Sequence, residues 1–241
     1  GYSLMYGGSV ADGWLYFGGL FFDPTVTADI VTDAGLVPAV DYLNQSFFAA
    51  TSAIVMSTLL GNKLGKTFAV VLSIIFSGII YPISGSWKWN GGWLDSLGFV
   101  DYAGSSIVHT VGATAGLAAL VATGKLGNEA GTEIVASNPV LAGVGALLAF
   151  FGYFGFTAGS QLAMDQWVPY VAVTTTLAAA GGSIGATVIS TMTSGKPDLT
   201  MIINGILAGL VSITAGCANL TLVGSWLAGL VGGVIVVFSV S

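Results

Sequence analysis

The stretch WKWNGGWLDSLGFVDYAGSSIVHTVGATAG, residues 87–116, passes from an aromatic, glycine-rich segment into an apolar, small-residue segment. It holds three of the six tryptophans in the chain and the only histidine, His109. His109 follows Asp101 by eight residues, well inside the apolar part. A titratable side chain is costly inside a membrane and usually marks a functional pathway. The stretch therefore predicts a helix that enters a membrane and carries a histidine into it.

The composition of the whole chain agrees with a membrane protein. Of its 241 residues 54% are hydrophobic and only 7% are charged, whereas about a quarter of the residues in a soluble domain are charged. The 36 glycines suit closely packed transmembrane helices. The apolar runs have about the 20 residues that a helical span needs, not the alternating pattern of an outer-membrane barrel. We expect an all-α integral membrane protein, a polytopic helical bundle.

The apolar runs divide the chain into seven expected full spans. Residues 1–6 read as the tail of a helix, 7–38 as a polar, acidic loop and 86–101 as an aromatic loop. Pairs of small residues four apart, which let helices approach closely, occur at Gly112 and Gly116, at Gly181 and Gly185, and at Gly205 and Gly209. The expected spans are 39–60, 67–85, 102–123, 139–162, 168–191, 199–216 and 223–241.

The lysines predict which loops face the cytoplasm. Because spans alternate in direction, loops 61–66, 124–138 and 192–198 share one side, and they hold four of the five lysines. Only Lys88 lies opposite, and the chain has no arginine. The positive-inside rule makes these three loops cytoplasmic. The single cysteine, Cys217, allows no internal disulfide.

Several residues have both a structural and a functional interpretation from the sequence alone. His109 shares a helix face with small residues, so it either bonds a neighbouring helix or lines a pathway. Asp101 is either the cap of the third span or an electrostatic aid to a cation. The tryptophans of the 86–101 loop are either an interface belt or rings that hold a cation. Phe47 and Phe48, and the group Phe150, Phe151, Phe154 and Phe156, are either lipid-facing or inward; the small, polar residues after Phe156 favour an inward position.

Enzymes and nucleic-acid binding are not expected from this sequence. It has no nucleophile elbow, no phosphate-binding loop and no carboxylate pair at helical spacing, and no basic patch for nucleic acid. With one histidine and one cysteine, no metal site is expected, and no cofactor is implied.

Five motifs together resemble the ammonium transporter (Amt/Mep) family, in one order along the whole chain. They are W-x-x-G-G-W-L-x-x-L-G-F-x-D-Y-A-G-x-x-x-V-H from Trp89 to His109, GYSL at 1–4, QSF at 45–47, FGFTAGS at 154–160 and GKP at 195–197. The resemblance implies an eleven-span fold with two five-span halves of opposite orientation, and a homotrimer with one pore per subunit. The chain would run as one transmembrane domain, 1–241, from the end of span two to span nine. Spans one, ten and eleven would then be absent.

The resemblance also implies roles for particular residues. Trp89 and Ser160 would form an outer ammonium site with Phe47, ordered by Asp101. Phe47 and Phe156 would be the two rings of the gate. His109 would be the first of two pore histidines, the second lying beyond Ser241.

The sequence departs from the family pattern at three positions. Taking Phe47 as the gate ring, the second aromatic residue of the outer site would stand four residues earlier, where this chain has Leu43. Ser105 replaces a common glycine and Tyr153 a usual tryptophan. The leucine leaves the outer site with one ring fewer.

The expected function is ammonium transport and nitrogen uptake. Ammonium would be recruited at the outer aromatic site and deprotonated, and ammonia would pass a hydrophobic, histidine-lined pore in the cell membrane. The expected partners are ammonium or ammonia, membrane lipid and two further copies of the chain. Two alternatives remain from the sequence: an ammonium sensor coupled to a cytoplasmic signalling domain, and a non-functional fragment.

Overall fold

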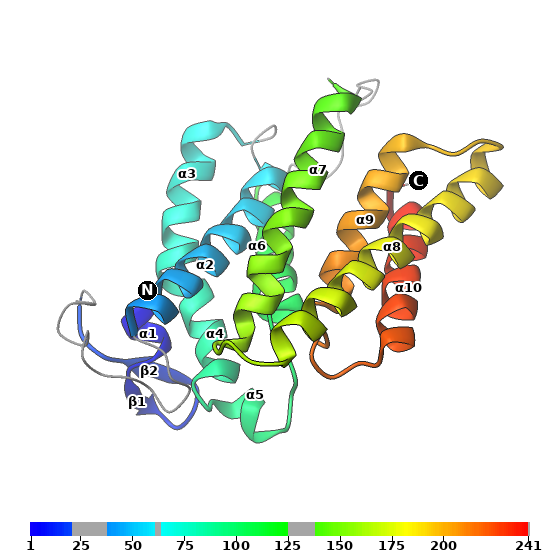
Figure 1. Cartoon of the computed structure of the whole chain (residues 1–241). Helices are drawn as coiled ribbons and strands as arrows, with labels where there is room; N and C mark the ends of the chain where they lie inside the picture. Colours follow the sequence, from blue (N-terminus) through cyan, green and yellow to red (C-terminus); the bar gives the residue numbers. More distant parts are fainter. Residues whose placement is uncertain (21–37, 61–63, 125–137, 241) are drawn as a thin grey trace. The chain divides into compact units, whose positions relative to one another are not determined.

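The computed structural model describes residues 1–20, 38–60, 64–124 and 138–240 (Figure 1). The chain forms two compact units, Gly1–Glu133 and Ile134–Ser241. The division falls inside the expected polar loop 124–138. In the described residues, each unit is built of helices, and the first also has one small hairpin.

The first unit begins with a short helix and a two-stranded antiparallel hairpin. In the hairpin, Ser9 pairs with Tyr16, and Gly13 takes a φ of +78° in the turn. This part of the expected 7–38 loop is therefore a hairpin; an Asp-Gly pair such as Asp12-Gly13 favours such a turn. Residues 21–37 of that loop lie outside the described residues. The elements are α1 (Tyr2–Met5), β1 (Gly8–Ala11) and β2 (Leu15–Phe17).

Three helical segments of the first unit are long and apolar enough to cross a membrane: Ala39–Leu60, Lys66–Ser96 and Ser105–Ala122. They match the expected spans, with two differences. The second stays helical as far as Trp89, into the expected aromatic loop, and the third begins at Ser105 and not at 102. The elements are α2 (Pro38–Leu60), α3 (Lys66–Ile75), the π-helix η1 (Phe76–Ile80), α4 (Tyr81–Trp89), α5 (Trp93–Ser96), the π-helix η2 (Ser105–Thr110) and α6 (Val111–Ala122).

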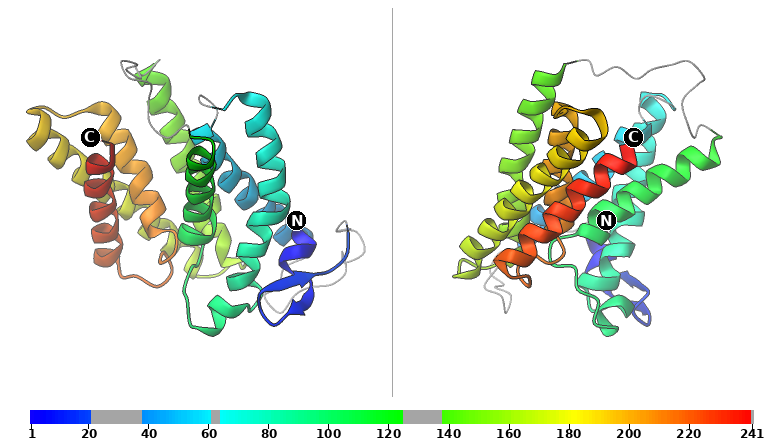
Figure 2. Two further views of the ribbon diagram at one scale, coloured as in Figure 1. Left: turned by 180° about the vertical axis from the view of Figure 1, so that it is seen from behind. Right: turned by 90° about the vertical axis from the view of Figure 1, so that its right-hand side faces the viewer.

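The second unit is a bundle in which α8, α9 and α10 lie side by side (Figure 2). Asn138 and Asp198 cap the starts of α7 and α9 by accepting backbone N–H bonds at 3.0 Å. Gly195, with a φ of +73°, ends α8. The elements are α7 (Pro139–Tyr153), the π-helix η3 (Phe154–Ala158), the 3₁₀ turn η4 (Gly159–Gln161), α8 (Trp167–Ser194), α9 (Leu199–Ile213) and α10 (Leu222–Val240).

Three segments of this unit qualify as membrane spans, and the remaining helix is shorter. Pro139–Gln161, Trp167–Ser194 and Leu222–Val240 are long and apolar enough. The sixth expected span, 199–216, is the 15-residue α9, which ends at Ile213. At 1.5 Å per residue it is about 22 Å long, less than the hydrocarbon core of a bilayer, which is about 30 Å thick.

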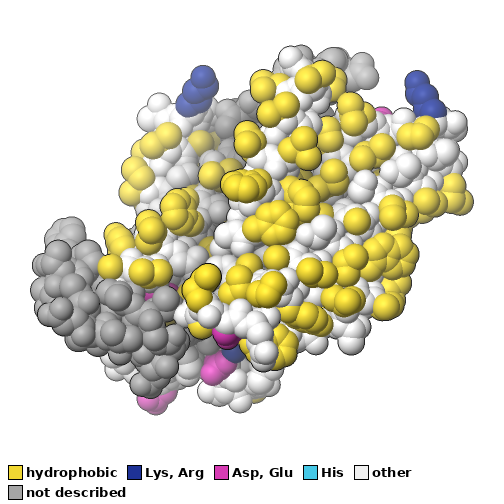
Figure 3. Space-filling model, viewed as in Figure 1, with side chains coloured by type: hydrophobic (Ala, Val, Ile, Leu, Met, Phe, Trp, Pro, Cys, Tyr) yellow, Lys and Arg dark blue, Asp and Glu magenta, His cyan; other side chains and the backbone are white. Residues whose placement is uncertain are grey.

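The surfaces of these helices suit lipid. Only 11% of the apolar window in Pro139–Gln161 is buried within the protein, and hydrophobic side chains cover the visible surface of α7 (Figure 3). Exposed apolar side chains on α7 include Val140, Leu141, Leu147, Leu148 and Phe151. The six candidate spans and this apolar surface make the chain a membrane-spanning protein.

Candidate functional site

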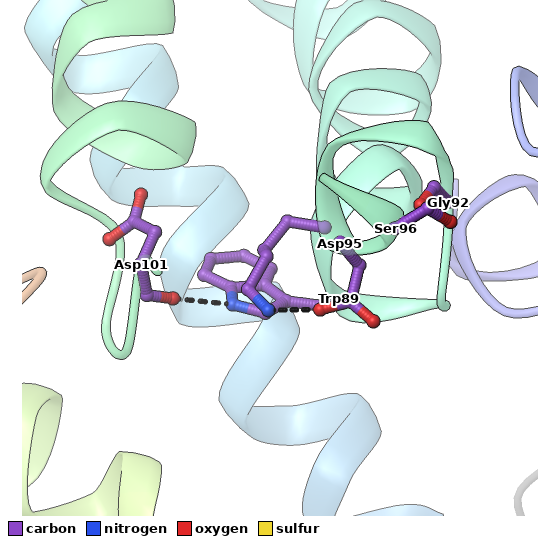
Figure 4. Close-up of polar contacts among 6 residues, drawn as sticks. Trp89, Gly92, Asp95, Ser96 and Asp101 are labelled. Carbon is purple, nitrogen blue, oxygen red and sulfur yellow. Dashed lines mark hydrogen bonds and ion pairs between the residues drawn. The ribbon is translucent and has the colours of Figure 1, made fainter. Parts of the chain in front are cut away.

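Trp89 connects three segments of the first unit. It lies at the end of α4, and its indole Nε1–H donates to the backbone carbonyl of Asp101 at 2.9 Å (Figure 4). The ring of Phe48, from α2, lies against it with the ring centres 5.7 Å apart. The bond fixes the edge of the indole, and the phenyl ring supports it from a second helix.

Phe48, and not Phe47, is the phenylalanine at this site. Phe48 is 3% exposed, whereas Phe47 is 61% exposed. In this unit Phe48, and not the expected Phe47, therefore lies against Trp89. Adjacent helix positions point about 100° apart, so a shift of one residue moves a ring from the interior to the surface.

The rotation of α2 about its axis distinguishes these two rings. Gln45, Phe48 and Ser52 are buried, whereas Leu43, Phe47 and Ile54 form an exposed apolar face. Gln45 and Ser52 face the protein interior, as polar residues within a span often do, but Ser46 on the same helix is exposed. Packing therefore identifies the inward side that Phe48 shares. Leu43 shares the exposed face of Phe47 and not the face that contacts Trp89. The residue one turn before Phe48 is Asn44.

Asp101 organises the turn that follows Trp89. The carboxylate is 1% exposed and accepts the backbone N–H groups of Gly104, Ser106 and Ile107 at 2.8, 2.9 and 2.9 Å. These are among the unpaired donors at the start of a helix, where a negative charge is favoured. Both carboxylate oxygens bind this backbone, so Asp101 caps the third span and holds Trp89 through its own carbonyl.

His109 is buried, 8% exposed, in the π-helical turn η2. This turn starts at Gly104, whose φ is +106° and whose hypothetical Cβ would lie 2.4 Å from Val108. Glycine is needed there both for the left-handed backbone and for space. Asp101 and Gly104 therefore set the direction in which the chain enters the span that carries His109.

Trp87 and Trp93, the other tryptophans of the aromatic loop, contact the hairpin. Trp93 stacks on Trp14 with ring centres 4.7 Å apart, and the Nε1–H of Trp87 donates to the Trp14 carbonyl at 2.9 Å. Lys88, the lysine expected on the outer side, forms an ion pair with Asp95. These contacts place Trp87 and Trp93 against the turn of the hairpin.

Phe156 and Ser160 lie together in the second unit, where α7 changes into a π-helix and then a 3₁₀ turn. The Ser160 hydroxyl donates to the carbonyl of Phe156 at 2.7 Å, and its oxygen keeps its capacity to accept a hydrogen bond. Tyr153 packs on Phe156 with ring centres 5.3 Å apart. Phe156 and Ser160 are both partly buried.

No metal centre occurs among the described residues, which contain no group of three or more His, Cys, Asp or Glu side chains placed to hold an ion. The first unit joins a partly buried indole, a buried aspartate and a buried intramembrane histidine. With the six candidate spans, these features define a polytopic helical membrane protein that carries polar side chains inside its spans.

Comparison with known proteins identifies the family. The sequence profile of the Ammonium Transporter Family matches residues 1–241, and the chain belongs to this family. It is 41% identical over 253 aligned residues to a putative ammonium transporter of Synechocystis sp., covering all of this chain and 55% of that protein. It is 40% identical over 187 residues to the ammonium transporter Amt2 of Archaeoglobus fulgidus, covering 71% of this chain and 40% of that protein.

Solved structures agree with the fold expected from the sequence. A sensor Amt protein superposes with a TM-score of 0.86 at 28% identity, over 99% of this chain and 60% of that one. Mep2 of Candida albicans superposes with a TM-score of 0.83 at 28% identity, over 99% of this chain and 54% of that one. The chain spans about half the length of the curated relatives it matches. The helical ammonium-transporter fold and a transport family, as opposed to an enzyme family, are confirmed.

Proposed function

We propose that the protein carries ammonium nitrogen across the cell membrane. Ammonium is recruited at the ring of Trp89 and loses a proton, and neutral ammonia then moves past His109 through an apolar pore. The observation that carries this proposal is the arrangement in the first unit. There Trp89 is held by Asp101, and the same aspartate caps the turn that buries His109.

The physical problem is the charge of the ion. Moving a bare cation into hydrocarbon is expensive, so the ion is bound outside and only its neutral form crosses. An aromatic face attracts a small cation more strongly where water is excluded, and the Trp89 ring is partly buried. Ammonium also donates hydrogen bonds, which potassium cannot do. An acceptor such as the Ser160 oxygen discriminates between the two ions.

We assign the first gate ring to Phe48, because it is buried and contacts Trp89. Phe156 and Ser160 keep the roles that the family resemblance implies, a gate ring and a hydroxyl acceptor. We further propose a homotrimer in which loops 61–66, 124–138 and 192–198 face the cytoplasm. The lysine distribution supports this orientation.

The test compares Phe48→Ala with Phe47→Ala in the full-length protein, reconstituted in liposomes. Because a cation–π or aromatic contact contributes about 1–2 kcal/mol, we expect Phe48→Ala to lower methylammonium uptake at limiting concentration about tenfold. Phe47→Ala, on the exposed face, is the matched control and should stay within about twofold. Equal losses in both variants, or no loss in either, would contradict the assignment of Phe48.

A second candidate function is ammonium sensing, which the similarity to the solved structure of a sensor Amt protein favours. Currents measured on a solid-supported membrane separate the two functions. A transporter gives a charge displacement with sustained turnover after an ammonium jump. A sensor gives a displacement that saturates with ammonium but has no sustained turnover, and that result would overturn transport.

A further inference from the structure

The backbone around His109 departs from regular α-helix. The N–H groups of Val108 and His109 both donate to the Gly104 carbonyl, at 3.0 and 3.1 Å, and the N–H of Val111 reaches back to Ser106 and Val108. Such π-helical turns are uncommon and are often found at functional sites. They hold side chains at angles that a regular helix does not provide.

Ser52 is bonded to this turn from the neighbouring helix α2. Its hydroxyl donates to the carbonyl of Val108, the residue before His109, at 2.7 Å. Both residues are 0% exposed. In a buried, apolar setting a hydrogen bond of this length is not weakened by competing water.

The bond distinguishes Ser52 from the other serines and threonines of α2. Each of those hydroxyls bonds a carbonyl of its own helix three or four residues back, which is the ordinary arrangement in a span. They are Ser46, Thr51, Ser57 and Thr58. Among these five residues Ser52 alone reaches a second helix, and the carbonyl that it selects adjoins the histidine.

Gly112 makes the contact possible. A Cβ on Gly112 would lie 2.5 Å from the Ser52 carbonyl oxygen and 3.0 Å from its hydroxyl oxygen. Any larger residue would push α6 away from α2 and lengthen the bond. The small residues that share a helix face with His109 therefore form the surface against which α2 packs.

The same face of α2 reaches the outer site. Phe48, one turn before Ser52, contacts Trp89. Gln45, one turn earlier again, accepts a hydrogen bond from Tyr81 at 3.0 Å and donates one to Tyr6 at 2.8 Å. One helix face therefore connects the ring that meets the ion to the turn that carries the histidine.

We propose that Ser52 is a positioning residue for the imidazole of His109. By holding the Val108 carbonyl it fixes the π-helical turn, and with it the direction of the His109 side chain. The role rests on the proposed function, in which His109 lines the path of ammonia. Ser52 itself does not touch the transported molecule.

The experiment uses Ser52→Ala in the full-length, reconstituted protein. The Val108 carbonyl retains the N–H of Val111, so the variant should fold. Loss of one buried hydrogen bond should lower the maximal flux of methylammonium about fivefold. The half-saturation concentration should stay unchanged, because the outer site is intact. The imidazole ¹⁵N resonance of His109, identified by its loss in His109→Asn, should shift or broaden as the ring takes more than one orientation.

Two further variants control the test. Ser57→Ala removes a hydroxyl that bonds only within α2 and should leave both the flux and the resonance unchanged. Ser52→Cys, a weaker donor of similar size, should be intermediate. A lower melting temperature with unchanged flux and an unchanged His109 resonance would mean a merely structural bond and would overturn the proposal. Absence of any flux in the wild type would instead overturn the transport function, while the resonance still tests the position of His109.

Discussion

At the scale of single residues, Asp101 carries two interpretations that the sequence left open. The structure favours the cap, since the carboxylate binds three backbone N–H groups. The Asp101 carbonyl holds the indole of Trp89. In the proposed function, Asp101 would therefore act on an ion only indirectly, through the ring it fixes and the turn it organises.

Replacing Asp101 tests this cap. Asp101→Ala leaves three buried or partly buried N–H groups without their acceptor. Because hydrogen bonds to charged groups contribute about 1.5–3 kcal/mol each and do not add fully, we expect a loss of roughly 3 kcal/mol. The thermal melting temperature of the detergent-solubilised full-length protein should fall accordingly. Asp101→Asn retains one acceptor and should lose less, and an unchanged melting temperature in the alanine variant would disprove the cap.

The spacing of Trp89, Asp101 and His109 was readable from the sequence because all three belong to one continuous stretch. The choice between Phe47 and Phe48 was not, because it depends on how α2 is rotated against α4. Gln45 and Ser52 carried that phase, but only a packed neighbour shows which polar residues are inward.

At the scale of elements, small residues set the packing of α8 against α9 and α10. The expected close approaches at Gly181, Gly185, Gly205 and Gly209 are confirmed, since a Cβ at each would come within 2.5 Å of an atom on a neighbouring helix. Gly229 on α10 shows the same: its Cβ would lie 2.0 Å from the Ala178 carbonyl on α8. At these positions the backbone of one helix lies directly against its neighbour.

We therefore expect Gly229→Ala to destabilise the second unit. The added methyl group cannot be accommodated by a side-chain rotation, and overpacking of this kind costs about 1–3 kcal/mol. The control is Gly152→Ala on α7, where no atom lies within 4 Å of the added carbon. This variant should be neutral or slightly stabilising, by up to about 1 kcal/mol. Melting curves of both proteins in the same detergent provide the measurement, and equal stability of the two variants would refute the packing argument.

Element boundaries were less predictable than the elements themselves. Hydropathy places the apolar runs, but the start of the third span at Ser105 depends on the bonds from Asp101. The hairpin of β1 and β2 was missed, although Asp12-Gly13 favours a turn, because single short strands have weak sequence signals. The shorter α9 ends where residues 214–216 continue as a turn, which hydropathy does not register.

At the scale of the whole molecule, the orientation in the membrane is open to a direct labelling test. Within residues 1–241 the one native thiol, Cys217, is buried. In a full-length protein from which any other cysteine has been removed, introduced cysteines therefore report their own exposure. Lys196→Cys lies in a loop proposed to be cytoplasmic, and Leu97→Cys, at a position 75% exposed, lies in the opposite aromatic loop. A membrane-impermeant maleimide applied to intact cells should label only Leu97→Cys. Lys196→Cys should react only after permeabilisation, and the reverse pattern would invert the proposed topology.

Hydropathy and spacing in the sequence alone predict the class of this protein, the apolar segments that form its helices, and the order of Trp89, Asp101 and His109 along one stretch. The tertiary structure alone decided that Phe48 is the ring at Trp89, that Asp101 binds backbone and that Ser52 bonds the turn of His109. The physical reason is that these contacts join separate segments, and the rotation of one helix against another follows from packing that no single stretch encodes.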